Sequence, residues 1–93
     1  MFDRVLHRFR QLVQSGRYVM TIHAHEEMED DGFTVFDVEN GLLTGAIVER
    51  QRDRTTGEWK YLVEGKTLAG EDCVVVGKIT PTGKLAILTV YSA

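Results

Sequence analysis

Three histidines are the residues best suited to proton transfer near neutral pH, because the imidazole pKa lies close to that value. They are His7, His23 and His25, and the last two lie within three residues of Glu26 in the sequence. A metal-binding protein built on His23, His25 and Glu26 is one interpretation of this cluster. Zinc takes three or four ligands at a recognisable spacing, and in a helix His23 and His25 would lie about 200° apart. We therefore expect no metal and no cofactor, and interpret the cluster as the polar start of a helix.

Arginines alternate along the segment that follows residue 48. Arg50, Arg52 and Arg54 are spaced by two residues, which in a strand places all three guanidinium groups on one face. We expect Lys60 on the next strand to join this face, because the aromatic residues on either side of it would point the other way. Guanidinium groups bind phosphate oxygens in a bidentate fashion, so such a face suits an RNA backbone. The alternative is a charged, solvated face that protects an edge hairpin from aggregation.

Aromatic and hydroxyl side chains gather on the later predicted strands. Aromatic rings on an open sheet can stack single-stranded bases, but they more often pack beneath a helix. Shared strand faces are expected for Trp59, Tyr61 and Val63, and again for Leu85, Ile87, Thr89 and Tyr91. We expect both sets to lie in the core, because the helices must cover an apolar face.

Metal-free cleavage of RNA is the chemistry that these residue types could perform together. It needs a base to take the 2′-hydroxyl proton, an acid to protonate the 5′-oxygen, and a cation beside the phosphate. The candidate catalytic residues are His23 for proton transfer, with Arg50, Arg52, Lys60, Lys78 and Tyr61 around the phosphate. The candidate RNA-binding residues are Arg50, Arg52, Arg54, Lys60 and Tyr91.

Hydrophobic periodicity indicates the elements that must position these residues. The spacing of apolar residues predicts a helix over 3–15, and Thr34 can cap another that ends near Gly45. A short extended segment, 18–22, and a polar helical stretch, 23–31, lie between them. From residue 46 the period changes to two, which predicts strands over 47–54, 59–63, 74–79 and 85–91. The expected fold class is α+β, with two or three N-terminal helices packed on a four-stranded antiparallel sheet in which 74–79 is central.

Length and composition describe a small globular protein. The chain has 93 residues, 43% of them apolar and 27% charged, so we expect residues 1–93 to form one domain. A core of this size leaves little room for a deep pocket, and any chemistry is expected on an open face. The only cysteine, Cys73, precedes three valines and is predicted to be buried and inert. No signal peptide or membrane-spanning run is visible, which favours a cytoplasmic protein with no membrane partner.

The net charge of −3 conceals an uneven distribution. Residues 1–22 carry +3, residues 23–45 carry −7 and residues 46–93 carry +1. The acidic block includes Glu26, Glu27, Asp30 and Asp31. One hypothesis is that these acids bind a basic partner, since charge complementarity speeds association. The remaining, weakly basic part of the chain still allows a face that meets phosphate.

Short motifs spread over residues 18–92 resemble a widespread domain-of-unknown-function family of small bacterial proteins. They are His23-Ala24-x-x-x-Met28-x-x-x-Gly32-Phe33, Asp37-Val38-Glu39, Gly45-Ala46-Ile47-Val48-Glu49, Lys60-Tyr61-x-Val63-x-Gly65, Val74-Val75-Val76-x-Lys78 and Leu88-Thr89-Val90-Tyr91. The usual signature of that family runs His-Ala-x-x-Arg-Met-x-x-Arg-Gly. Glu27 and Asp31 therefore stand where the signature carries arginine.

That family is similar to the RelE and MqsR group of type II toxins, compact α+β ribonucleases that cleave mRNA and are neutralised by an antitoxin. The resemblance implies a RelE/MqsR-like fold, a metal-independent mRNA endoribonuclease and a cognate antitoxin, which for close members looks like a small zinc-finger protein. Acids at positions 27 and 31 would weaken RNA binding if they bordered the site. Two hypotheses remain open. Either the active face lies on the sheet, or this branch has lost cleavage and binds a partner through its acidic helix.

Overall fold

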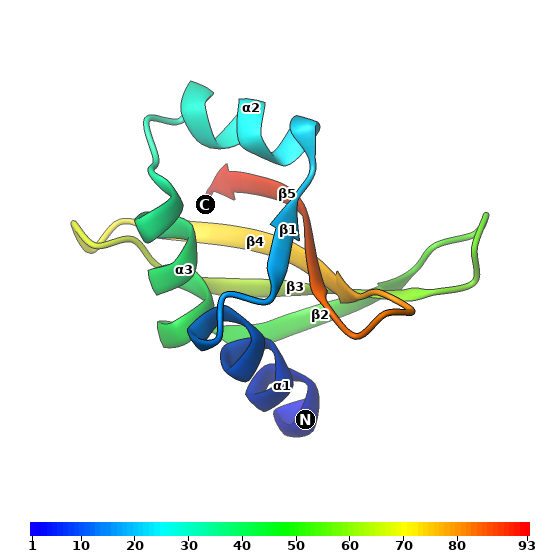
Figure 1. Cartoon of the computed structure of the whole chain (residues 1–93). Helices are drawn as coiled ribbons and strands as arrows, with labels where there is room; N and C mark the ends of the chain where they lie inside the picture. Colours follow the sequence, from blue (N-terminus) through cyan, green and yellow to red (C-terminus); the bar gives the residue numbers. More distant parts are fainter.

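A five-stranded sheet and three helices form the protein; α1 and α3 lie across one face of the sheet, and α2 lies beside β5 (Figure 1). This computed structural model describes residues 1–93. The elements are, in chain order, α1 (Asp3–Gln14), β1 (Tyr18–Met20), α2 (Ile22–Asp30), α3 (Val35–Thr44), β2 (Ala46–Arg52), β3 (Trp59–Lys66), β4 (Asp72–Ile79) and β5 (Leu85–Ser92). The strand order is β1-β5-β4-β3-β2, so the valine-rich strand β4 is central, as predicted. None of the helices is long and apolar enough to cross a membrane.

The α+β class is confirmed, but the prediction of a four-stranded antiparallel sheet is wrong. The sheet is mixed, because β1 pairs in parallel with β5, with Tyr18 opposite Leu85 and Met20 opposite Ile87. The sequence indicated an extended segment here. Only three residues of β1 belong to the sheet, and so short a strand carries no alternation that would reveal its partner.

Hydroxyl caps determine where α2 and α3 begin. The Thr21 hydroxyl accepts a hydrogen bond from the Ala24 N–H at 3.1 Å. Thr34 and Asp37 form a reciprocal capping box, which confirms the predicted Thr34 cap. The Asp37 carboxylate also accepts from the Leu68 N–H at 3.0 Å, and these backbone hydrogen bonds hold its pKa below the usual value. The capping box therefore also fixes the loop that joins β3 to β4.

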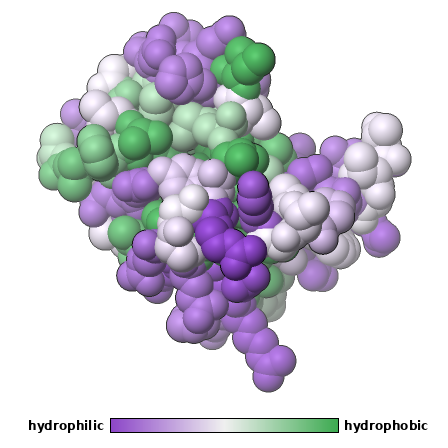
Figure 2. Space-filling model, in the orientation of Figure 1, coloured by the Kyte–Doolittle hydropathy of each residue, from purple (hydrophilic) through white to green (hydrophobic).

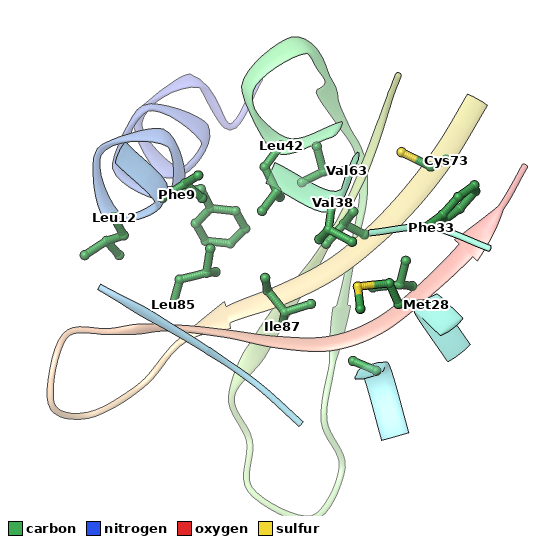
Figure 3. Close-up of a cluster of buried hydrophobic side chains, with 14 residues drawn as sticks. Phe9, Leu12, Met28, Phe33, Val38, Leu42, Val63, Cys73, Leu85 and Ile87 are labelled. Atoms are coloured by element: carbon green, nitrogen blue, oxygen red, sulfur yellow. The ribbon is translucent and has the colours of Figure 1, made fainter. Parts of the chain in front are cut away.

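The hydrophobic core fills the space between the sheet and the helices. In Figure 3, Phe9 and Leu12 of α1 and Leu42 of α3 point toward the sheet, and each is at most 1% exposed. Burial of side chains this large stabilises the fold by roughly 1.5–3 kcal/mol each. Cys73 is buried in the same core, as predicted. Burial raises the pKa of its thiol, so the side chain stays protonated and unreactive.

Glycines allow α3 to pack directly on β3. A Cβ atom on Gly65 of β3 would lie 2.0 Å from the Gly41 carbonyl oxygen of α3, and a Cβ on Gly41 would lie 2.7 Å from the Cys73 Sγ. Real Cβ atoms cannot approach other atoms this closely. The two backbones therefore touch only because both positions lack a side chain.

A β-bulge changes the faces of β2 part-way along its length. Ile47 lies opposite Val63, but Glu49 already lies opposite Leu62. Val48 is therefore an extra residue without a partner. Every residue of β2 that follows it points to the face opposite the one that uninterrupted alternation predicts.

The bulge overturns the prediction that Lys60 shares a face with the arginines. Without the extra residue Arg50 would lie opposite Lys60, whereas in the structure Arg50 lies opposite Tyr61 and Arg52 opposite Trp59. Both arginines therefore lie on the helix-covered face of the sheet, and Lys60 lies on the other face. Alternation predicted the faces correctly within β3. It failed for the part of β2 that follows Val48, because the extra residue shifts the alternation there by one.

A second bulge separates residues of β5 that were expected to share a face. Leu88 is the extra residue between two pairs with β4. Ile87, before the bulge, is fully buried in the core. Thr89 and Tyr91, after it, lie on the face away from α1 and α3, so the prediction that they belong to the core is wrong.

Candidate functional site

The face of the sheet that α1 and α3 do not cover carries several polar side chains. We call it the open face. Its side chains are those of Lys60, Leu62 and Glu64 of β3, Val74, Val76 and Lys78 of β4, and Thr89 and Tyr91 of β5. Val74 and Val76 are themselves buried, so the accessible groups lie around them. No pocket is hollowed into the protein, so a ligand here would meet a surface, as the short chain led us to expect. Tyr91 is 38% exposed.

Two lysines lie side by side on the open face. Lys60 and Lys78 flank the Tyr61–Gly77 pair on adjacent antiparallel strands, which places them opposite each other. The Lys78 ammonium lies 2.7 Å from Glu58 Oε2, while Lys60 has no carboxylate within ion-pair distance. Like charges on neighbouring strands repel each other, so this pair would gain from an anion placed between them.

Glu58 completes a cluster with Lys60 and Lys78, although its sequence position alone did not suggest a role. Its Oε2 atom is shielded from solvent and has no hydrogen-bond partner, although it forms an ion pair with the Lys78 ammonium. The rest of the side chain is accessible, since 35% of it is exposed. Glu58 precedes Lys60 by two residues, so the period of two along β3 could have placed both on one face.

The positive charge of the lysines extends to the turn between β2 and β3. The pKa of Asp53 is lowered mainly because its carboxylate accepts hydrogen bonds from the N–H groups of Thr56 and Thr55. The charges of Lys60 and Lys78 lower it further. The lysines, Glu58 and Asp53 thus influence one another across one end of the open face.

Tyr61 and the arginines lie on the opposite face. The Tyr61 ring makes edge contacts with Phe2 and Phe9 of the N-terminal segment, at centroid distances of 5.7 and 5.9 Å. The Arg50 and Arg52 Cζ atoms lie 4.1 and 5.2 Å from the centre of the Trp59 ring. The predicted catalytic set therefore divides, with Lys60 and Lys78 on one face and Tyr61, Arg50 and Arg52 on the other.

Arg54 is not part of a ladder with the other two arginines. The strand ends at Arg52, and Arg54 lies in the hairpin turn. The reason is local: the Asp53 carboxylate accepts the N–H groups of the two residues after Arg54 and starts the turn. The predicted strand over 47–54 was two residues too long.

His23 lies beside β5, toward the edge of the sheet opposite β2. Its Nε2 atom is 3.1 Å from Glu27 Oε1, and its side chain is 70% exposed. It belongs to α2, beside β5, whereas the arginines lie on β2. Three interstrand spacings, about 14 Å, separate β5 from β2, so the structure does not bring His23 and the arginines together.

The acids that replace the arginines of the expected signature bind the edge of β5. Glu27 Oε1 accepts from the Val90 N–H at 3.3 Å, and Asp31 Oδ2 accepts from the Ser92 N–H at 3.0 Å. Acids four residues apart on a helix are separated by about 6 Å, close to the nearly 7 Å between alternate residues of a strand. Because the two spacings match, the acids accept hydrogen bonds from backbone N–H groups of β5 that β1, which ends at Met20, does not pair.

The other acids and the second histidine of α2 face solvent. Glu26 and Asp30 are exposed, and His25 pairs with Glu29 at 2.8 Å. The two histidines thus each pair with a glutamate one turn later along α2. No group of three or more histidine, cysteine or acidic side chains is arranged to hold a metal ion.

A comparison with models of protein families finds a match, which covers most of the chain. A family model described as Domain of unknown function (DUF4258) matches residues 20–92. The chain belongs to the DUF4258 family. No curated protein and no solved structure matches it. The DUF4258 region runs from the end of β1 through β5 and contains every candidate site residue, whereas α1 and Phe2 lie outside it.

Proposed function

We propose that this protein is a toxin-type endoribonuclease of a type II toxin–antitoxin system, which cleaves RNA on the open face without a metal. The observation that carries the proposal is the cluster of Lys60, Lys78 and Glu58. Two ammonium groups lie on neighbouring strands of an uncovered face, and a partly shielded carboxylate lies 2.7 Å from one of them. The sequence motifs that resemble relatives of RelE and MqsR support the same class of activity.

The cluster holds the groups that metal-free RNA cleavage requires. Glu58 takes the proton of the 2′-hydroxyl, and the 2′-oxygen attacks phosphorus. The bond from phosphorus to the 5′-oxygen breaks, and the leaving oxygen takes a proton from the Lys78 ammonium. Lys60 stabilises the negative charge that develops on the phosphate. The products are a 2′,3′-cyclic phosphate and a 5′-hydroxyl, and proton exchange with solvent then deprotonates Glu58 and reprotonates Lys78.

The remaining residues of the open face serve binding in this proposal. Tyr91, exposed on β5, offers a ring on which a base can stack. His23 lies at the β5 edge, where it can contact RNA that leaves the sheet. Glu27 and Asp31 are engaged with β5, so these acids oppose RNA less than free carboxylates would.

Cleavage of a labelled single-stranded RNA in the presence of EDTA tests the proposal. The wild-type protein is expected to produce fragments that end in a 2′,3′-cyclic phosphate. The double variant Lys60→Ala/Lys78→Ala should lose at least about 100-fold in rate, since each removed group stabilises charge in the transition state. Lys84→Ala is the matched control, because Lys84 lies in the exposed turn between β4 and β5. Undiminished cleavage by the double variant would contradict the assignment.

A basic protein partner is the second candidate function, and an antitoxin would be such a partner. Glu26 and Asp30 lie one turn apart on the exposed side of α2, and neither forms an ion pair. They can therefore bind cationic side chains without breaking a contact of the fold. A purified protein that leaves RNA intact, yet binds a basic small zinc-finger protein in a salt-sensitive manner, would favour this function. Glu26→Lys/Asp30→Lys should then abolish the complex.

A further inference from the structure

The face opposite the lysines carries a tryptophan that contacts two arginines. Trp59 is the only tryptophan of the chain and is 37% exposed at the start of β3. The β2–β3 hairpin projects beyond the body of the protein (Figure 1). The Arg50 Cζ atom lies 4.1 Å from the centre of the Trp59 ring and 5.4 Å from that of Phe2. A flat aromatic and cationic platform therefore stands at the base of the hairpin.

The guanidinium groups of this platform are not neutralised within the chain. All four ion pairs of the protein use lysine or histidine as the cation. Arg50 contacts only aromatic rings as a cation, and Arg52 donates its Nε–H to the Gly57 carbonyl at 3.1 Å. A guanidinium carries five N–H donors, so most donors of both side chains are free for an external acceptor. On the helix side, Figure 2 shows hydrophilic side chains around α1 and over much of α2, with hydrophobic ones between α2 and α3.

We infer that Arg50, Arg52 and Trp59 form a nucleotide subsite that holds single-stranded RNA on the face opposite the cleaved bond. A base stacks on the Trp59 and Arg50 planes, and the free donors bind the flanking phosphates. A single-stranded nucleic acid offers both a flat ring and an anion at every nucleotide, and RNA is the one that the proposed function supplies. A duplex keeps its bases stacked and cannot use the platform.

The position of β2 makes the two faces accessible to one strand of RNA. β2 is the edge of the sheet, and Trp59 and Lys60 are consecutive residues that point to opposite faces of β3. An RNA strand that crosses this edge passes from the lysines to the platform within a few nucleotides. The subsite rests on the proposed function, because it supposes that the lysines hold the same RNA.

Fluorescence of the single tryptophan reports the subsite directly. An unlabelled single-stranded RNA of ten nucleotides is expected to quench Trp59 emission in a saturable manner, whereas a duplex of equal length should not. Arg50→Gln should weaken binding by about tenfold, the loss typical of one stacked base. Arg52→Gln provides a second variant, and circular dichroism confirms that each is folded. Lys84→Ala should bind as the wild type does.

The outcomes separate this inference from the proposed function. Cleavage of RNA without quenching, and with wild-type affinity in both arginine variants, would overturn the subsite and leave the ribonuclease proposal standing. Quenching that both variants weaken, in a protein that leaves RNA intact, would support the subsite and overturn the ribonuclease proposal. Polyglutamate that quenches as strongly as RNA would assign the platform to an acidic polypeptide and overturn the subsite.

Discussion

The Glu27 carboxylate of α2 accepts a hydrogen bond from the backbone N–H of Val90 on β5, at 3.3 Å. Asp31 repeats the contact one helical turn later with Ser92. An unpaired strand edge is a template for aggregation, and here carboxylates occupy the N–H groups that a sixth strand would use. The acidic residues of α2 suggested a partner-binding face in the sequence. In the structure, two of them instead bind the edge of β5 and stabilise the fold.

Glu27→Ala is expected to destabilise the protein by about 1 kcal/mol, because it leaves the Val90 N–H without its partner. Hydrogen exchange at Val90 should accelerate in this variant, and the melting temperature should fall by about 4–8 °C. Glu27→Gln retains an acceptor oxygen and should lose less. Glu26→Ala is the matched control on the exposed side of α2. Unchanged exchange at Val90 in Glu27→Ala would show that the contact does not form in solution.

Gly65→Ala is expected to be among the most damaging single substitutions in the chain. Its Cβ would lie 2.0 Å from the Gly41 carbonyl oxygen, so α3 would have to move away from β3. Overpacking of this kind costs about 3 kcal/mol or more. Gly70→Ala is the comparison, because a Cβ there meets no atom within 4 Å and its φ of 82° is the sole source of strain. It should cost about 1 kcal/mol. If urea unfolding gave the same loss of unfolding free energy for Gly65→Ala and Gly70→Ala, the packing of α3 on β3 would be contradicted.

Local signals predicted most elements of this fold. The apolar spacing indicated α1, the Thr34 cap indicated α3, and the change of period at residue 46 indicated the strands. These signals depend on residues within one or two turns of one another. The pairing of β1 with β5 depends on residues far apart in the chain. Nothing in the composition of so short a strand reveals such a partner.

The candidate site was predictable as a set of residue types but not as an arrangement. Alternation along one strand correctly joined Trp59 to Tyr61 and separated both from Lys60. The error arose between strands, because the extra residue at Val48 shifted the register by one. A shift of one residue exchanges the two faces, and it separated Arg50 from Lys60. The residues at such a bulge have no distinctive composition, so its position could not be predicted from one sequence.

Alkaline pH is expected to weaken the protein through Tyr18. Burial and the hydrogen bond that its hydroxyl donates to Glu39 raise the pKa of Tyr18 to about 12, against about 10 in the unfolded chain. The folded state therefore keeps this proton where the unfolded state loses it, so the stabilising contribution is complete below about pH 10 and disappears as pH approaches 12. In urea unfolding, the free energy of unfolding of the wild type should therefore fall between about pH 10 and 12. In the Tyr18→Phe variant it should fall less over the same range.

The Glu39→Ala variant checks the cause of that effect. Without the acceptor, the absorbance change that accompanies ionisation of Tyr18 should move to lower pH, although burial still opposes ionisation. An absorbance titration at the tyrosinate band, with Tyr18→Phe as the blank, measures the shift. A titration unchanged by Glu39→Ala would mean that burial alone accounts for the raised pKa.

The Glu58–Lys78 pair allows a structural role to be separated from a catalytic one. Lys78→Ala leaves the shielded Glu58 Oε2 without its cation, and Glu58→Gln removes the charge instead. Since both side chains are partly exposed, a double-mutant cycle in urea should give a coupling of about 0.5–1 kcal/mol. A pair that only stabilises the fold would show this coupling while every folded variant cleaved RNA at the wild-type kcat. In the ribonuclease proposal, Glu58→Gln lowers kcat even under conditions where the variant is fully folded, because the base for the 2′-hydroxyl is lost. Single-turnover cleavage by the folded variants measures this difference.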